Sequence, residues 1–316
     1  METKQMYVAD LNVVFGKKEE PLIKHIDDIV LPALQSRRYI ESSERVGYIF
    51  ENVQLNEIEE SEYIIQGILI KDTVLDIMSE YSSDRGLEKT NKHFKSSPYS
   101  VFLIYLRNHR MLLVKNQAGS PDIRSFGVAL RETVKGYVAQ QNIELRFADA
   151  KLLPMPKIHI AGIKTAQNVK EALKDVEKIS QLTFKFYPLN SEWDYGSVFG
   201  QIDRTIRKEI GSKKGKMVFT SPKSKDGVAE IIESTEGLVQ SEMKVTYKSD
   251  LSISGTKKRG TIRDNEISDV MNIDLVNELD EAYLEIYENG KDIKALEVQP
   301  QNNLMYYREF LEKRGK

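Results

Sequence analysis

The sequence contains no cysteine, a single tryptophan and four histidines among its 316 residues. The absence of cysteine excludes disulfides, thiolate nucleophiles, Cys-ligated zinc and iron–sulfur clusters. The histidines are scattered, with no pair at i, i+4 spacing, so the sequence predicts no metal site. A glycine-rich phosphate loop, a nucleophile elbow and a dinucleotide fingerprint are also missing, so we expect neither a catalytic residue set nor a cofactor.

Long apolar runs are absent as well. Nothing in the sequence approaches the roughly 18 consecutive apolar positions that a membrane-spanning helix needs. The first residues lack the cationic and apolar regions of a signal peptide. Since the lack of cysteine also fits a reducing compartment, we expect a cytoplasmic protein with no membrane insertion.

The length and the 40% hydrophobic content are typical of two ordinary domains. Pro154 and Pro156 interrupt the middle of the chain, because proline continues neither a helix nor a central strand. We therefore predict an N-terminal α+β domain over 1–153 and a C-terminal α+β domain over 154–316. In both domains we expect mixed or antiparallel sheets with helices packed on their faces.

The N-terminal half shows alternating strand patterns and helical spacing in turn. A nearly continuous apolar run, a polar turn and a second apolar run between Tyr99 and Asn116 indicate a buried antiparallel pair. Asp122 is positioned to cap the helix that follows. The other predicted elements of this half are a strand over 7–16, a helix from Pro21 to Leu34, and a hairpin of 46–54 with 63–71.

The C-terminal half is predicted to add a second small α+β layer. A helix over 198–210 carries apolar residues at helical spacing, which leaves its cations on the opposite side. The Asn289-Gly290 pair suggests the turn of a hairpin over 284–298. The remaining predicted elements are strands over 158–163, 182–187, 216–220, 238–247 and 261–262, and helices over 165–178 and 304–313.

Lys and Arg are concentrated between Arg204 and Lys225, where eight cations stand against the single acid Glu209 in a chain of net charge −2. Charge segregated in this way usually faces a polyanion, although a solvated helix face is the common alternative. Lys257-Lys258-Arg259, between Gly255 and Gly260, is predicted to form a basic loop tip. The predicted phosphate contacts are Arg204, Arg207, Lys208, Lys213, Lys214, Lys216, Lys257, Lys258 and Arg259. This pattern favours a non-enzymatic protein that binds double-stranded DNA without sequence preference.

Two other functions stay open. Glu242 and Lys244 have the acid-x-Lys spacing that places both side chains on one side of a strand, and Asp226 or Glu230 could add a carboxylate for a metal-dependent nuclease. The acidic region from Asp264 to Glu297 could instead dock on the basic face of another copy, in an interaction module. Such self-complementary charge favours homo-oligomers.

The middle of the chain resembles the RexA-like phage exclusion proteins. The resemblance depends on residues 97–105, the return strand 111–114, the loop 118–122 with its helix, and 158–163 followed by 165–178, about a third of the chain. It implies a dimeric, cytoplasmic protein that binds DNA with little sequence preference and takes part in bacterial antiviral defence. A partner protein of the same defence system would then be expected. No individual functional residue is carried over from this resemblance.

Overall fold

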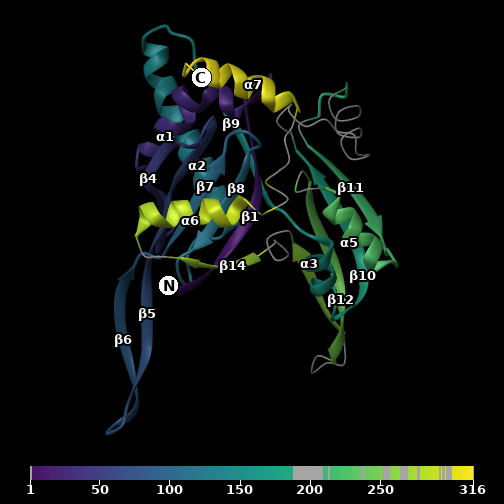
Figure 1. Cartoon of the computed structure of the whole chain (residues 1–316). Helices are drawn as coiled ribbons and strands as arrows, with labels where there is room; N and C mark the ends of the chain where they lie inside the picture. The colour runs from purple at the N-terminus through teal and green to yellow at the C-terminus, as the bar shows by residue number, and fades with distance from the viewer. Residues whose placement is uncertain are drawn as a thin grey trace.

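The chain folds into two antiparallel sheets with helices packed on them, an α+β architecture as predicted. The computed structural model describes residues 2–187, 209–212, 214–235, 237, 239–251, 257–263, 270–275, 278–291, 293, 296 and 301–315. Figure 1 shows the larger sheet beside the smaller one, which carries helices α3 and α5. No helix in this described part is long and apolar enough to cross a membrane.

The larger sheet has the strand order β14-β1-β8-β7-β5-β4-β3, with β2 and β9 paired to β1 and β6 paired to β5. The buried pair predicted between Tyr99 and Asn116 is β7 and β8, and the hairpin predicted for 46–54 with 63–71 is β4 and β5. The strands are β1 (Glu2–Phe15), β2 (Glu20–Pro21), β3 (Ile40–Ser43), β4 (Val46–Glu59), β5 (Glu62–Ser82), β6 (Gly86–Ser96), β7 (Tyr99–Tyr105), β8 (Arg110–Lys115), β9 (Pro156–Gly162) and β14 (Val270–Leu275).

Helices cover both faces of this sheet. On one face, the side chains of β1 at Leu11, Val13 and Phe15 pack against the helices that follow β2 and against α2. On the other face, Met6 and Val8 pack against α6. Asp122 caps α2 as predicted, since its carboxylate accepts a hydrogen bond of 2.7 Å from the backbone N–H of Ser125. The helices are η1 (Leu22–His25), η2 (Ile26–Val30), α1 (Leu31–Gln35), α2 (Ile123–Phe147), α6 (Leu279–Lys291) and α7 (Gln301–Glu312).

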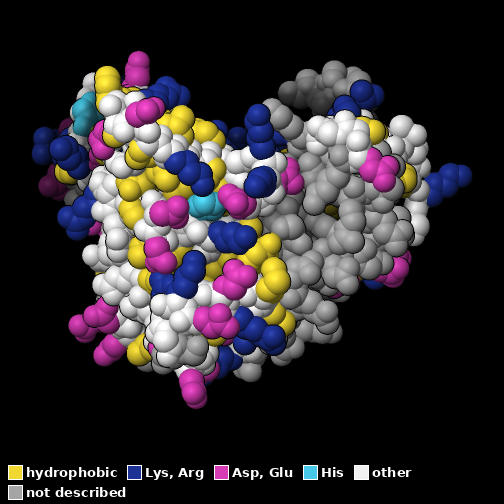
Figure 2. All heavy atoms as spheres, turned by 90° about the horizontal axis from the view of Figure 1, so that it is seen from above, with side chains coloured by type: hydrophobic (Ala, Val, Ile, Leu, Met, Phe, Trp, Pro, Cys, Tyr) yellow, Lys and Arg dark blue, Asp and Glu magenta, His cyan; other side chains and the backbone are white. Residues whose placement is uncertain are grey.

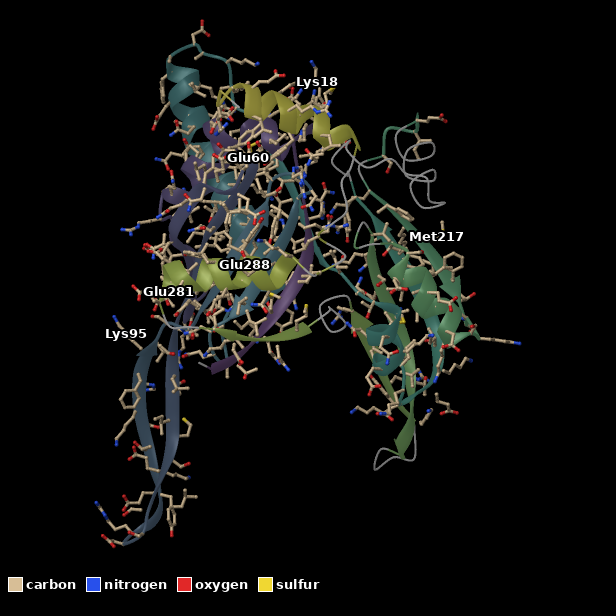
Figure 3. The ribbon with its side chains drawn as sticks, in the orientation of Figure 1. Lys18, Glu60, Lys95, Met217, Glu281 and Glu288 are labelled. Atoms are coloured by element: carbon tan, nitrogen blue, oxygen red, sulfur yellow. The ribbon has the colours of Figure 1, made fainter. Side chains whose placement is uncertain are left out.

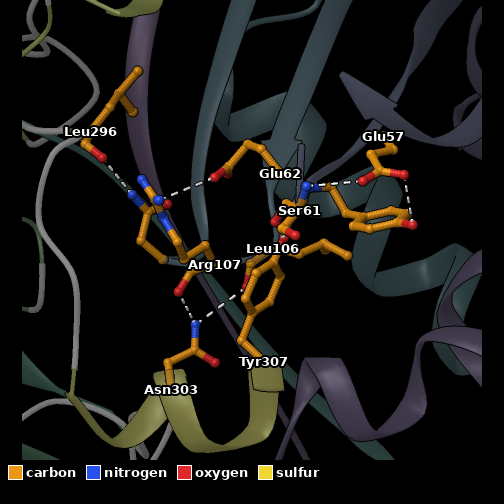
Figure 4. Close-up of polar contacts among 10 residues, drawn as sticks. Glu57, Ser61, Glu62, Leu106, Arg107, Leu296, Asn303 and Tyr307 are labelled. Atoms are coloured by element: carbon orange, nitrogen blue, oxygen red, sulfur yellow. Dashed lines mark hydrogen bonds and ion pairs between the residues drawn. The ribbon is translucent and has the colours of Figure 1, made fainter. Parts of the chain in front are cut away.

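Polar side chains of α7 form hydrogen bonds with the β4–β5 and β7–β8 hairpins (Figure 4). The Tyr307 hydroxyl accepts a hydrogen bond from the backbone N–H of Tyr63 at 2.9 Å and donates one to the carbonyl of Ser61 at 2.8 Å. The Asn303 amide donates to the carbonyls of Leu106 and Arg107. These bonds satisfy backbone groups in the turns of β4–β5 and β7–β8, so α7 closes the end of the sheet.

The smaller sheet has the order β11-β10-β12-β13, and one of its faces packs on α3 and α5. Leu182, Phe184 and Met243 lie on that buried face, against Val228 and Ile232 of α5. The elements are α3 (Ala166–Ala172), β10 (Val176–Phe186), β11 (Gly215–Thr220), α5 (Lys225–Glu233), β12 (Gln240–Leu251) and β13 (Lys257–Arg263). The opposite face carries the alternate residues of the same strands.

The division between the sheets does not coincide with the predicted boundary at residue 153. β9 pairs with β1, and β14, α6 and α7 also belong to the larger sheet, although all four lie after that boundary in the sequence. The two prolines mark the entry into β9: Pro156 is its first residue, where a missing N–H is tolerated. The chain therefore leaves the larger sheet only after Gly162 and returns to it at Val270.

The structure corrects the predictions for residues 284–298 and 165–178. Residues 284–298 were predicted to be a hairpin, but Asn289 and Gly290 lie within α6, whose buried positions 283, 286, 287 and 290 follow helical spacing against the sheet. The helix predicted over 165–178 ends at Ala172, and Val176 begins β10. The helix predicted over 198–210 lies outside the described residues except for its last two.

No element was predicted between residues 71 and 99. Among the residues that the structure describes, β5 beyond Thr73 pairs only with β6, and this two-stranded arm projects from the body of the protein (Figure 1). Lys95, opposite Val74, lies where the arm leaves the sheet (Figure 3). Cross-strand partners share a face, so Leu75 lies beside Phe94 and Tyr81 beside Leu87. These four residues are 57%, 50%, 77% and 74% exposed, on an arm face that also carries Lys92 opposite Ile77 and Lys89 opposite Ser79.

Candidate nucleic-acid interface

The open face of the smaller sheet is rich in cations. Because Leu182 and Phe184 point toward α5, the alternate residues Thr183 and Lys185 point the other way, together with their cross-strand partners. Lys216 lies opposite Lys185 on β11. The cations of this open face come from all four strands and are Lys178, Lys185, Lys216, Lys244, Arg259 and Arg263.

Helix α2 presents a second row of cations toward this sheet. Arg124, Arg131 and Lys135 are spaced by seven and four residues, which places them along one side of the helix. Arg124 lines a cavity of about 360 Å³ together with Lys185, Glu242 and Arg263 of the smaller sheet. Side chains of α2 and of the smaller sheet therefore line one cleft.

A larger cavity adjoins the first, and Gln240 lines both. Its volume is about 690 Å³, and its walls come from β1, α2 and β9 on one side and from the ends of β10 and β12 on the other. Figure 2 shows Lys and Arg side chains, with Asp and Glu among them, on the described surface beside the indentation between the two lobes. The charged residues that line the two cavities are the cations Arg124, Arg131, Lys135, Lys157, Lys185, Lys214 and Arg263 and the carboxylates Asp10 and Glu242.

Both carboxylates of the cleft are already paired with cations. Glu242 lies 2.9 Å from the Lys185 ammonium and 4.0 Å from the Arg263 guanidinium, and its hydrogen bond to Lys185 lowers its pKa. Asp10 lies 3.3 Å from the guanidinium of buried Arg110. Within the described part of the chain, no carboxylate forms an ion pair with Lys135 or Lys214. The cleft therefore has an excess of positive charge available to an anionic ligand.

An aromatic pair lies inside the larger cavity. The imidazole of His159, on β9, stacks on the ring of Tyr187 with centroids 3.9 Å apart and an interplanar angle of 22°. Burial, together with the nearby charges of Arg131 and Lys214, lowers the pKa of His159 to about 4. The ring is consequently neutral at physiological pH, although it lies among cations.

The two sheets meet beneath this cavity through small and polar residues. Gly237 has a positive φ of 80°, and a Cβ placed there would lie 3.3 Å from the Cβ of Asp10 and 3.4 Å from Ile163. The backbone approaches closely at this point because the residue is glycine. Lys164, which follows β9, is buried, and its ammonium donates to the Ser241 hydroxyl at 3.3 Å.

The predicted phosphate contacts are only partly brought together. Lys214 lines the larger cavity, and Lys216 and Arg259 lie on the open face of the sheet. Lys258 points to the other face, with its ammonium 5.7 Å from the centre of the Tyr247 ring. Arg204, Arg207, Lys208 and Lys213 lie outside the described residues, and so does the side chain of Lys257.

The basic loop tip predicted at 257–259 was wrong. These residues form the start of β13, where Lys257 pairs with Leu251 and Arg259 with Thr246. The flanking glycines suggested a loop, but the pairing with β12 extends the sheet. Because β11 and β13 are the two edges of that sheet, Lys216 and Arg259 are separated by the width of β10 and β12.

The prediction missed the contribution of α2. Arg124, Arg131 and Lys135 are dispersed in the sequence, so they form no basic run. Their seven- and four-residue spacing on a predicted helix is a signal that could have identified a cationic side. Their position opposite the smaller sheet depends on tertiary packing.

The residues of the nuclease alternative do not converge. Asp226 and Glu230 lie on α5, which packs on the buried face of the smaller sheet, whereas Glu242 lies on the open face. Asp226 forms an ion pair of 3.3 Å with Lys170. Among the residues that the structure describes, no group of three His, Asp or Glu side chains is placed to hold a metal ion.

No family model matches the chain, and no curated protein matches it either. The function is therefore inferred from the geometry of the cleft.

Proposed function

We propose that this protein is a non-enzymatic DNA-binding protein that holds the phosphate backbone in the cleft between α2 and the smaller sheet. The observation that carries the proposal is the excess of cations on both walls. Of the seven Lys and Arg that line the two cavities, Lys185 and Arg263 pair with Glu242 and Lys157 pairs with Glu19. Arg124, Arg131, Lys135 and Lys214 remain without an ion pair to a described carboxylate. Contacts of this kind recognise phosphates and carry no base information, so the binding would be independent of sequence.

Lys216, Lys244 and Arg259 extend the same surface across the open face of the sheet. This extension supports a ligand longer than the cavities themselves, such as double-stranded DNA. With about six to nine phosphates neutralised, the logarithm of the affinity should fall with the logarithm of salt concentration at roughly 0.9 per contact.

The test is binding to a labelled 30-base-pair duplex across a salt series, repeated with Mg²⁺ and Mn²⁺. A steep salt dependence without cleavage is the expected result. Cleavage that Glu242→Gln abolishes would instead establish the nuclease alternative. Absence of binding at low salt would contradict the proposal and leave the cations as a solvated surface.

We also propose that the protein is a homo-oligomer and that it acts in the cytoplasm in antiviral defence, with a partner protein of that system. The defence role depends on the resemblance to RexA-like phage exclusion proteins. Support for self-association comes from the arm, whose four exposed apolar side chains present roughly 500 Å² per copy. Two copies packed through this face would bury about 1,000 Å², close to the 1,200–2,000 Å² range of stable interfaces.

A further inference from the structure

We propose that the larger cavity binds one nucleoside monophosphate unit, with its phosphate among Arg131, Lys135 and Lys214 and its base added to the stack of Tyr187 and His159. This inference rests on the proposed function, because the nucleotide would be the unpaired end of a DNA strand that the protein has bound. A free nucleotide presents the same chemistry, and the experiment below distinguishes the two sources.

The size of the cavity fits a single nucleotide and excludes a duplex. Its volume of about 690 Å³ lies in the 300–1,000 Å³ range of small-molecule sites. The cavity is lined by elements of both sheets, whereas the cations of the open face, such as Lys216 and Arg259, lie outside it. A duplex bound along that face would therefore bring only its end to the cavity.

The electrostatics of the cavity select an anion. Lys135 and Lys214 line it without a carboxylate partner in the described part of the chain, and Arg131 donates to the carbonyl of Ile158 at 3.3 Å. Arg131 and Lys214 are close enough to His159 to lower its pKa, so at least these two charges share the space around the imidazole. A phosphate placed there would neutralise cations that now repel one another.

The aromatic pair adds recognition of a flat ring. Tyr187 and His159 are stacked on each other and both line the cavity. A neutral imidazole stacks on a base without adding charge, and the Tyr187 hydroxyl is held by the side chain of Gln240. Base–aromatic stacking accepts every base, which agrees with binding that is independent of sequence.

Calorimetric titration with adenosine monophosphate and with inorganic phosphate at low salt tests the inference. The wild type should bind the nucleotide more tightly than phosphate. Tyr187→Ala should weaken nucleotide binding roughly 5- to 100-fold and leave phosphate binding unchanged, because only the stack is removed. Lys135→Glu should weaken both ligands. Lys95→Glu, the same charge change on the arm face opposite to Leu75, is the matched control and should change neither.

The source of the nucleotide is tested with two duplexes, one with both ends closed by hairpin loops and one with a single-stranded overhang. Tighter binding of the overhang duplex, lost in Tyr187→Ala, supports the strand end as the ligand. If the nucleotide binds but the overhang duplex binds no more tightly than the closed one, the ligand of the cavity is a free nucleotide and not a strand end.

The two proposals fail in different ways. Binding of the closed duplex with no binding of the nucleotide overturns the cavity proposal and leaves the proposed function standing. Nucleotide binding without duplex binding overturns the proposed function and keeps the cavity as a nucleotide site. Equal affinity for phosphate and nucleotide overturns the stacking role of Tyr187 and His159.

Discussion

Arg110 and Asp10 face each other across β8 and β1, with the guanidinium 3.3 Å from the carboxylate and both side chains almost fully buried. Asp10 also lines the larger cavity, so this ion pair lies where the larger sheet meets the cleft. An isolated charge in such a position is strongly destabilising, because it has lost its hydration without gaining a counter-ion. The pair therefore keeps the floor of the cleft neutral while its walls remain cationic.

We expect Arg110→Met to lower the free energy of unfolding by about 3–5 kcal/mol, since it leaves the Asp10 carboxylate buried without its guanidinium partner. Urea denaturation measures the change. Lys92→Met is the matched control, because Lys92 pairs with Glu80 at 2.7 Å on the exposed arm, where such pairs contribute less than about 1 kcal/mol. Equal losses in the two variants would contradict this account.

His159 should make stability depend on pH. Burial lowers its folded pKa to about 4, below the value near 6.5 expected in the unfolded chain. The unfolded state therefore binds more protons between these values, and the stabilisation due to neutral His159 is complete above pH 6.5 and lost as pH falls toward 4. The loss amounts to at most about 3 kcal/mol.

We expect His159→Gln to show a weaker decline in the free energy of unfolding between pH 7.5 and pH 4.5 than the wild type does. Urea denaturation at several pH values in this range measures it. His93→Gln, on the exposed arm, is the control for losing a histidine. Parallel curves for the wild type and His159→Gln would show that His159 does not contribute.

We expect the protein to self-associate through the exposed apolar side chains on one face of the arm. The double variant Tyr81→Ser with Leu87→Ser removes the two most exposed apolar side chains of that face, and we expect it to weaken association at least tenfold. Sedimentation velocity over a range of protein concentrations measures the shift toward monomer. Leu284→Ser, at a 55% exposed site on α6, is the control. A wild type that stays monomeric at high concentration and low salt would contradict self-association.

Sequence patterns predicted those elements whose signals are local. The β7–β8 pair and the Asp122 cap of α2 are each specified by neighbouring residues. The Asn289-Gly290 pair led to a wrong hairpin prediction. The local preference of this pair for a turn stabilises less than the burial of one face of α6 against the sheet. The arm was not predicted, because polar residues interrupt the apolar alternation of Leu75, Ile77 and Tyr81 that would indicate a strand.

The candidate site could be predicted only in part, because residues far apart in the sequence form it. Lys214 and Lys216 belong to a basic run and were found, whereas Arg124, Arg131 and Lys135 precede that run by about 80 residues and were not. The cleft exists because β9 and Lys164 lead from the larger sheet to the smaller one, and Gly237 allows close approach. Such long-range packing is not encoded in any single stretch of sequence.

The two walls of the cleft can be tested separately. We expect Arg124→Glu, on α2, and Lys216→Glu, on β11, each to weaken DNA binding and to flatten the salt dependence, because each removes about one phosphate contact. In the double variant, the slope of the salt dependence should decrease by about the sum of the two single decreases. Fluorescence anisotropy with the 30-base-pair duplex across a salt series measures the slopes. Lys95→Glu controls for the change in net charge, since Lys95 lies on the arm face opposite to Leu75 and the arm is remote from the cleft (Figure 1). A slope altered by Lys216→Glu but not by Arg124→Glu would show that the ligand contacts only the smaller sheet.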